Sequence, residues 1–134
     1  MGESAAVKLL TTFLGTCIVY AFGGVDLILR VLLFFIVLDY ITGLMKAFKN
    51  KELSSSVGWN GLMKKIGTLI AVIVAHQMDK IGPTGSQLFR NAVVTFFIAN
   101  EGVSLVENLA IIGVPVPSIL KRALKAWKEE AEVE

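Results

Sequence analysis

Four long apolar segments, separated by short polar stretches, dominate the pattern of hydrophobic and polar positions along the chain. They cover about residues 5–22, 27–48, 62–78 and 88–114. Each is at least as long as the roughly 17 residues that an α-helix needs to cross a hydrocarbon layer about 30 Å thick. The glycine pair at 23–24 marks the end of the first segment, and Gly113 with Pro115 marks the end of the fourth. The pattern therefore predicts helices that span a membrane.

The stretch at about 117–130 has a different pattern. Its apolar residues share one helical face, and its basic residues occupy the others. The apolar set is Ile119, Leu120, Ala123, Leu124 and Trp127, and the basic set is Lys121, Arg122, Lys125 and Lys128. Such a helix is typical of the membrane surface. We therefore expect an all-α integral membrane protein, residues 1–134 as one membrane domain, with three to four transmembrane helices plus a C-terminal amphipathic surface helix.

Composition supports a membrane protein over a soluble domain. Of the 134 residues, 54% are hydrophobic without counting glycine and only 18% are charged. Soluble domains are about 45–50% apolar with glycine included and about 25% charged. The single cysteine, Cys17, excludes a disulfide framework and a multi-cysteine metal site.

The distribution of lysine and arginine predicts the orientation. If four segments cross, ten basic residues share one side of the membrane, and Arg30, Lys80 and Arg90 lie toward the other. The ten are Lys8, Lys46, Lys49, Lys51, Lys64, Lys65, Lys121, Arg122, Lys125 and Lys128. The positive-inside rule then places both termini and the 49–61 loop in the cytoplasm. If segment 5–22 lies in the interface instead, three segments cross and the N-terminus is outside. Ser56 is the expected N-cap of the third helix.

Polar residues inside the apolar segments are the informative ones, because a charge at mid-bilayer needs a partner or water. In the fourth segment, one face of about 120° carries the polar side chains. These are Arg90, Asn100, Glu101, Ser104, Glu107 and Asn108. The stripe either packs against polar groups of neighbouring helices in one bundle or faces water in an oligomeric pore, and the pattern favours neither.

The second and third segments each carry a smaller polar face. Asp39, Thr42, Gly43 and Lys46 share one face, with Asp39 about two turns inside the boundary that a snorkelling Lys46 would set. On the third, Lys65, Thr68, Val72, His76 and Asp79 share another. The lone His76 is expected to be a hydrogen-bonded structural residue and not a metal ligand.

Motifs for catalysis are missing from the sequence: it has no nucleophile elbow, no phosphate-binding glycine loop and no Cys/His cluster. The basic residues flank apolar helices, so they predict membrane-surface contacts and no nucleic-acid binding. We therefore expect no enzyme, no metal and no cofactor.

Two blocks of sequence carry a family resemblance. The first is "LDYITGLMKAFKNKELSSSVGWNGLMKKIG" (38–67), which contains Asp39, Thr42, Gly43, Lys46, Ala47, Ser54, Ser55, Gly61, Lys64 and Lys65. The second is "NEGVSLVENLAIIGVPVPSILKRAL" (100–124), which contains Glu101, Ser104, Glu107, Asn108, Gly113, Pro115, Pro117 and Leu120. In this order the blocks resemble the signature regions of the phage lysis and toxin-secretion holins, a family that includes clostridial prophage holins.

The resemblance implies a homo-oligomer in the bacterial cytoplasmic membrane that opens lesions. These would release an endolysin or a large toxin, which would be a functional partner without stable binding, and membrane lipids would be the main contact. It favours the stripe of the fourth segment as an assembly interface or pore lining. Asp39 is then a polar helix–helix contact first and a pore-lining charge second.

Two other functions fit the residues. A small four-helix multidrug-type transporter would use a membrane-embedded carboxylate, Asp39 or Glu101, to exchange protons. A structural membrane-anchoring subunit would neither transport nor lyse.

Overall fold

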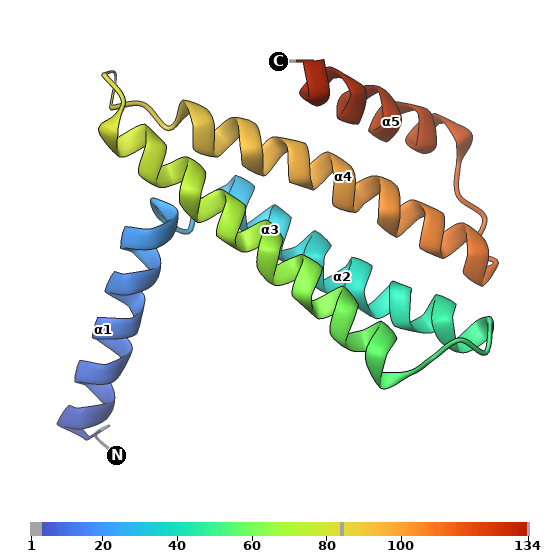
Figure 1. Ribbon diagram of the computed structural model, residues 1–134, viewed down its shortest axis with the longest axis horizontal. Helices are drawn as coiled ribbons and strands as arrows, with labels where there is room; N and C mark the ends of the chain where they lie inside the picture. The colour runs from blue at the N-terminus through green and yellow to red at the C-terminus, as the bar shows by residue number, and fades with distance from the viewer. Residues whose placement is uncertain (1–3, 84, 134) are drawn as a thin grey trace.

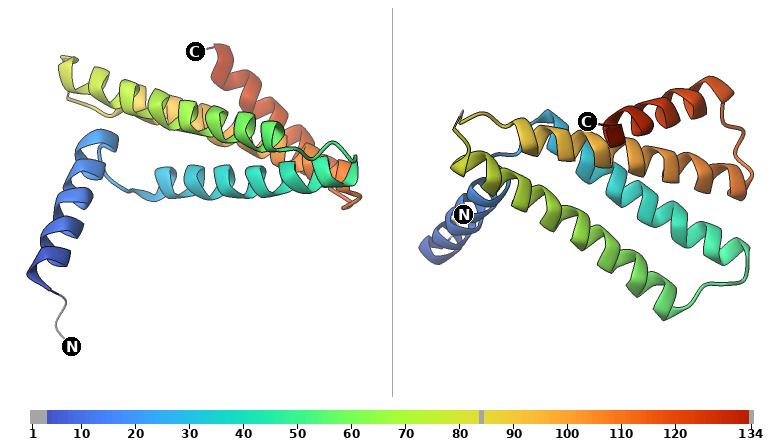
Figure 2. Two further views of the ribbon diagram at one scale, coloured as in Figure 1. Left: turned by 60° about the horizontal axis from the view of Figure 1, so that its bottom comes forward. Right: turned by 45° about the horizontal axis from the view of Figure 1, so that its top comes forward.

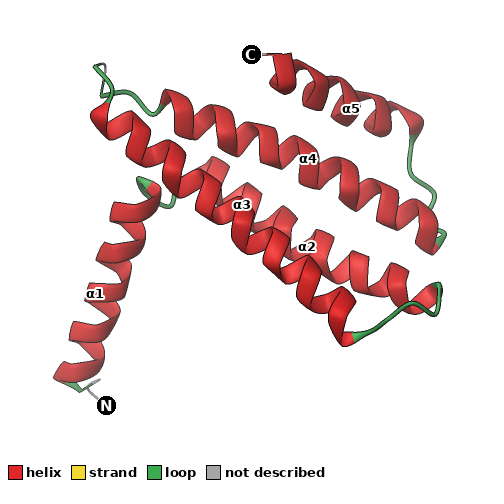
Figure 3. Cartoon of the chain, viewed as in Figure 1, coloured by secondary structure: helices red, strands yellow, loops and turns green. Residues whose placement is uncertain are grey.

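The computed structural model describes residues 4–83 and 85–133, and these form five α-helices without a strand (Figures 1 and 3). The helices are α1 (Ala5–Phe22), α2 (Leu27–Lys49), α3 (Ser55–Ile81), α4 (Leu88–Ile112) and α5 (Ser118–Val133). The first four are long and apolar enough to cross a membrane. The all-α membrane fold predicted from the sequence is confirmed.

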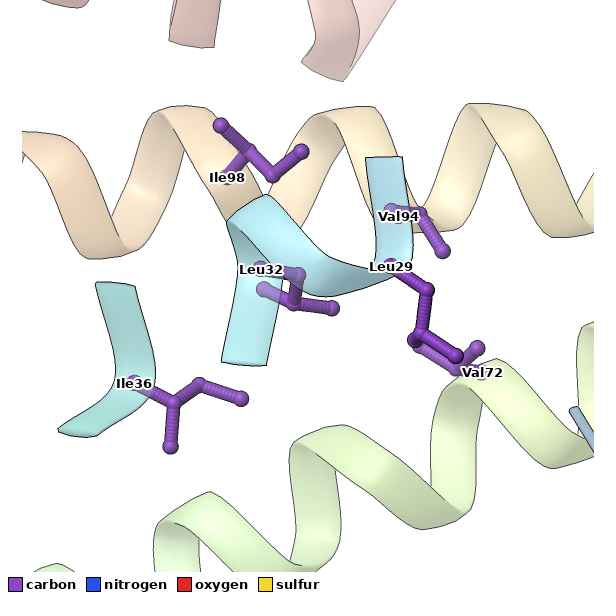
Figure 4. Close-up of a cluster of buried hydrophobic side chains, with 6 residues drawn as sticks. All are labelled: Leu29, Leu32, Ile36, Val72, Val94 and Ile98. Atoms are coloured by element: carbon purple, nitrogen blue, oxygen red, sulfur yellow. The ribbon is translucent and has the colours of Figure 1, made fainter. Parts of the chain in front are cut away.

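Helices α2, α3 and α4 form a bundle, in which α2 and α4 make the most extensive contact. Its apolar core consists of Leu29, Leu32 and Ile36 of α2, Val72 of α3, and Val94 and Ile98 of α4 (Figure 4). The α2 and α4 members belong to the first half of each helix, so the core fills the end of the bundle near the 23–26 and 82–87 loops. Lipid tails are as apolar as leucine, so packing and not water exclusion holds such a core together.

Helix α3 is longer than the sequence pattern predicted. It begins at Ser55, seven residues before the apolar segment, and its N-cap is Ser54 and not Ser56. The hydroxyl of Ser54 accepts a hydrogen bond from the backbone N–H of Val57 at 3.2 Å. The polar first turns remain helical because they pack against α2: Tyr40 donates a hydrogen bond to the carbonyl of Gly58 at 3.3 Å. The other predicted boundaries agree with the structure to within three residues.

Helix α1 is not part of the bundle. Its C-terminal end lies near the end of α3, and the helix points away from the bundle at a steep angle (Figures 1 and 2). Every residue from Ala5 to Tyr20 is exposed. Only its last turn is held. Lys80 of α3 donates a hydrogen bond to the carbonyl of Tyr20 at 2.9 Å, and its ammonium lies 3.4 Å from the centre of the Tyr20 ring.

Helix α5 runs back along α4 in the opposite direction (Figures 1 and 2). It lies against the bundle, because Leu124 fits the space that Gly102 leaves open, and its place on the membrane surface stays a prediction. A Cβ atom added at Gly102 would be 3.0 Å from Leu124 Cδ2. Helix α5 carries seven charged residues, and each would cost about 2.5–3.5 kcal/mol at the centre of a bilayer. The surface that α5 presents is therefore much more polar than the outer faces of α2 and α3.

Candidate functional site

Three charged side chains meet inside the bundle, close to the middle of the three helices that contribute them. The ammonium of Lys65 on α3 lies 2.5 Å from Asp39 Oδ2 on α2 and also contacts Glu101 Oε2 on α4. The exposed fraction of the side chain is 15% for Lys65, 8% for Asp39 and 4% for Glu101. We call Asp39, Lys65 and Glu101 the charged triad. It holds two carboxylates against one ammonium, so it joins all three helices of the bundle through Lys65.

Asparagine 108 extends the triad along α4. Its side-chain amide donates to Asp39 Oδ1 at 2.9 Å and to the hydroxyl of Thr42 at 3.2 Å. Thr42 in turn donates to the carbonyl of Leu38 at 2.9 Å. Asp39 thus uses one carboxylate oxygen for the ammonium and the other for the amide. A buried carboxylate with both oxygens bound is the arrangement that limits the cost of desolvation. Asp39 thus makes a polar contact between α2 and α4 within one chain, and its role in assembly between copies stays a prediction.

The neighbouring glycine on α2 allows this approach. A Cβ atom added at Gly43 would lie 3.7 Å from Asn108 Nδ2, which is ordinary van der Waals contact. Asp39 lies near the middle of α2, and its predicted depth of about two turns inside the membrane boundary stays a prediction. A carboxylate at that depth depends on its partners.

An open cavity of about 680 Å³ connects the triad with the α2–α3 loop. Charged and amide side chains dominate its lining, which includes Asp39, Lys46, Glu52, Asn60, Lys64, Lys65, Asn100, Glu101, Ser104, Glu107, Asn108 and Lys128. The bundle is thus divided: one half is filled by the apolar core, and the other half is hollow and polar. The cavity is wide enough for water, which supplies the second means of keeping charges at membrane depth.

The predicted polar stripe of α4 faces this cavity and the triad. Asn100, Ser104 and Glu107 line the cavity, while Glu101 and Asn108 are buried in the triad and its extension. Within one subunit the stripe therefore packs against α2 and α3. Arg90 is separate from the other members, at the opposite end of α4.

Arg90 is fully buried and holds the α1–α2 loop against the start of α4. It donates two hydrogen bonds of 2.9 Å to the carboxylate of Asp26 and others to the carbonyls of Phe22 and Gly24. Hydrogen bonding to Arg90 holds the pKa of Asp26 below its usual range. Asp79 completes the cluster: its carboxylate accepts from the backbone N–H groups of Phe89 and Arg90 at 2.9 and 2.8 Å and so caps α4.

His76 is a buried residue of α3 whose imidazole lies against the loop after α1. Gly23 adopts a φ of 76° there, and a Cβ atom at this position would lie 2.5 Å from His76 Cε1. The Nδ1 atom of His76 has no hydrogen-bond partner within the described residues. Among those residues there is also no group of three or more His, Cys, Asp or Glu side chains that could hold a metal ion. His76 packs against Gly23, but the hydrogen bond expected for it is not found at Nδ1.

The basic residues predicted at the membrane surface divide into three groups. Lys65 lies inside the bundle, because two carboxylates draw it there. Lys49 donates to the carbonyls of Ile111 and Ile112 at 2.8 and 2.9 Å, which caps the C-terminus of α4. The others form no ion pair with a described residue; they are Lys46, Lys51, Lys64, Lys121, Arg122, Lys125 and Lys128.

The sequence pattern predicts the correct helical face for Lys65, but it predicts a membrane-surface position, whereas Lys65 contacts Asp39 and Glu101 inside the bundle. It is in helical register with Thr68, Val72 and His76, all of which are buried. A lysine that shares the buried face of its helix must find an acidic partner on another helix. That register was the available signal for an interior cation.

The chain is similar to known proteins over most of its length. Residues 16–129 match the model of the bacteriophage holin family. A protein of Bacillus phage phi105 named as a probable holin is 44% identical over 101 residues, which are 75% of this chain and 73% of the relative.

Two relatives come from Clostridium perfringens. An uncharacterized protein of strain 13 is 44% identical over 124 residues, 92% of each chain. An uncharacterized 14.9 kDa protein in the nagH 3′ region is 46% identical over 112 residues, 84% of this chain and 85% of the relative. No solved structure matches the chain. Because the family match covers most of the sequence and the relatives match over most of their own lengths, the chain belongs to the bacteriophage holin family.

Proposed function

We propose that this protein acts as a holin: it assembles as a homo-oligomer in the bacterial cytoplasmic membrane and opens lesions there. The lesions release an endolysin, or a large toxin, without stable binding of that cargo. The observation that carries the proposal is the family match over residues 16–129, together with the related probable holin of phage phi105.

The distribution of polar and apolar surface supports assembly within a membrane. Large apolar side chains are exposed on the outer faces of α2 and α3, including Phe34, Val37, Ile41, Ile66, Ile70 and Val74. These faces suit lipid tails or a second copy of the chain. The polar groups are gathered inside the bundle and on α5, which is the distribution needed to separate a lipid-facing from a water-facing side.

A lysis assay tests the proposal. The chain is expressed from an inducible promoter in a bacterium that accumulates a cytoplasmic endolysin without a secretion signal, and culture turbidity is followed. We expect an abrupt loss of turbidity only when both proteins are present. The control co-expresses a catalytically inactive endolysin, which should be released into the medium without lysis of the wall. Accumulation of the chain in the membrane fraction without release of endolysin would contradict the proposal.

A second test addresses the stripe of α4. Replacement of Glu101, Glu107 and Asn108 together by leucine should leave membrane insertion intact and abolish lysis. Glu107→Leu alone is the matched control, because Glu107 is exposed in the cavity and has no ion pair within the described residues. It should delay lysis at most. Unchanged lysis timing in the triple variant would refute a role of the stripe in opening the lesion.

We also propose that the C-terminus and the 49–61 loop lie in the cytoplasm, as the positive-inside distribution predicts. Single cysteines at Lys51 and Lys80, in a Cys17→Ser background, test this orientation in intact cells before induction of lysis. A membrane-impermeant maleimide added outside should label position 80 and not position 51. The reverse labelling would invert the proposed topology.

A further inference from the structure

The charges of α5 are distributed unevenly around the helix. The side toward α4 is centred on Leu124, which is half-buried. One flank carries the apolar residues Ile119, Ala123 and Trp127 together with Glu130, and the other carries Arg122, Lys125 and Glu129. We call Arg122, Lys125 and Glu129 the polar flank of α5. All three are exposed, and none forms an ion pair with a described residue.

The polar flank adjoins the hollow half of the bundle. Lys128 lines the large cavity that leads to the charged triad. A second cavity of about 350 Å³ lies between α4 and α5, and its lining includes Lys121 and Lys125. Glu107 lines both cavities. The lining of this smaller cavity is mostly apolar, and its charged members, Glu107, Lys121 and Lys125, lie between the cavity beside the triad and the exposed charges of α5.

The remaining outer surface of the bundle has the opposite character. The exposed faces of α2 and α3 are apolar, as Val37 and Val74 illustrate, with 55% and 53% of these side chains exposed. When α4 spans a membrane, a helix docked along it lies at membrane depth, and the unpaired charges of α5 then require water beside them. A ring of subunits satisfies both demands if α2 and α3 face lipid or neighbouring copies and α5 faces an aqueous centre.

We infer that α5 stays docked on α4 and forms the water-facing wall of the lesion. This inference rests on the proposed function and names the element that lines the opening. It assigns the lining to α5, whereas the polar stripe of α4 serves the interior of each subunit. In the competing arrangement, α5 leaves α4 and lies flat on the membrane surface before a lesion opens.

A disulfide between α4 and α5 distinguishes the two arrangements. In a Cys17→Ser background, Gly102→Cys is combined with Leu124→Cys, since these positions face each other across the helix pair. A second pair is Val106→Cys with Lys121→Cys. It lies one helical turn toward the C-terminus of α4 and the N-terminus of α5, and its residues line the smaller cavity. Each full-length protein is reconstituted into phosphatidylglycerol–phosphatidylethanolamine vesicles that contain a fluorescent protein, and release is measured oxidised and reduced.

Water contact is then measured on the oxidised protein. A spin label is attached at Lys125→Cys on the polar flank or, as the matched control on the same helix, at Ile119→Cys on the apolar flank. Collision with a water-soluble nickel complex and with oxygen reports whether each label meets water or lipid. We expect release by the cross-linked protein within about two-fold of the reduced protein, with position 125 exposed to nickel and position 119 to oxygen.

Loss of release on oxidation, restored at least ten-fold by a reductant in both cysteine pairs, would overturn the inference and show that α5 must leave α4. A label at position 125 that meets oxygen instead of nickel in the cross-linked protein would overturn it as well. If the Cys17→Ser parent itself releases nothing, the proposed function fails and not the assignment of α5 alone. Reduced variants that release their contents demonstrate that the substitutions leave the fold intact.

Discussion

Replacement of Lys65 by methionine tests whether the charged triad holds the bundle together. Methionine retains the length and much of the volume of the lysine side chain but removes the ammonium between Asp39 and Glu101. Two carboxylates would then face each other inside the bundle without a cation. Removal of one partner from a buried ion pair costs about 3–5 kcal/mol, and the adjoining cavity, which admits water, favours the lower part of that range.

The expected effect is large enough to measure directly. Since about 1.4 kcal/mol corresponds to a tenfold change in an equilibrium constant, Lys65→Met should lower the folding equilibrium constant roughly 10²–10⁴-fold. Unfolding by increasing mole fractions of dodecyl sulfate in mixed micelles, followed by circular dichroism, gives the free energy of unfolding. Lys64→Met is the control, because Lys64 is exposed and has no ion pair within the described residues; it should change that free energy by less than about 0.5 kcal/mol.

A compensated variant separates charge from packing. With Asp39→Asn and Glu101→Gln added to Lys65→Met, no buried charge is left unpaired, and the free energy of unfolding should return to within about 1–2 kcal/mol of the parent. Two results would refute the reasoning: a Lys65→Met protein as stable as the Lys64→Met control, or a neutral triple variant less stable than the single substitution.

Three further predictions concern the opposite end of the bundle. Arg90→Met should cost about 1–3 kcal/mol in free energy of unfolding, because the carbonyls of Phe22 and Gly24 lose their donor while water can solvate the partly exposed carboxylate of Asp26. It should also release the 23–26 loop, which limited proteolysis in detergent would detect as a new cleavage there. Arg90 lowers the pKa of Asp26 in the folded protein. The stability that this pair contributes is therefore complete above the ordinary carboxyl pKa of 3.8 and is lost as the pH falls through the lower pKa of the folded protein. In a series of unfolding curves at decreasing pH, Asp26→Asn should reduce this loss of stability at acid pH, the acid limb of the series. Gly23→Ala should destabilise by more than about 1 kcal/mol, measured by the same unfolding assay, because the residue has a positive φ and its methyl group would overlap His76.

Matched substitutions make these outcomes decisive. Gly24→Ala also places alanine at a positive φ of 115°, but no atom lies within 4 Å of the added Cβ; it should therefore cost less than Gly23→Ala, and equal costs would remove His76 from the explanation. Arg122→Met, at an exposed position of α5, should leave loop proteolysis unchanged. An acid limb that persists in Asp26→Asn would assign the pH dependence to another carboxylate.

The architecture could be predicted from the sequence because a transmembrane helix is a continuous run of apolar residues. The apolar runs and their Gly and Pro terminators give α1, α2 and α4 nearly to the residue. The start of α3 could not be found this way. Its first turns are polar and contain Gly58, and they are helical because Tyr40 packs on them from another helix. That contact depends on tertiary structure, so hydropathy alone does not reveal it.

The site shows the same division between local and long-range information. Helical periodicity grouped Glu101 with Asn108 and placed Asp39 on the face of Thr42, as the structure has them. Lys65 is 26 residues from Asp39 and 36 residues from Glu101 in the sequence. The three residues belong to three different helices, so no spacing within one helix indicates that they pair. The contact of α5 with α4 could not be predicted for the same reason, because an amphipathic pattern does not distinguish a lipid surface from a neighbouring helix.

The free attachment of α1 has a consequence for which substitutions the chain can accept. Between Ala5 and Gly15 the helix is exposed throughout, so no other described part of the same chain is fitted against those positions. This changes at the last turn, where Tyr20 and Gly23 meet Lys80 and His76. The family match begins at residue 16, close to this boundary. A different apolar helix of similar length could therefore replace residues 5–15, whereas the pivot at 20–24 would have to be kept.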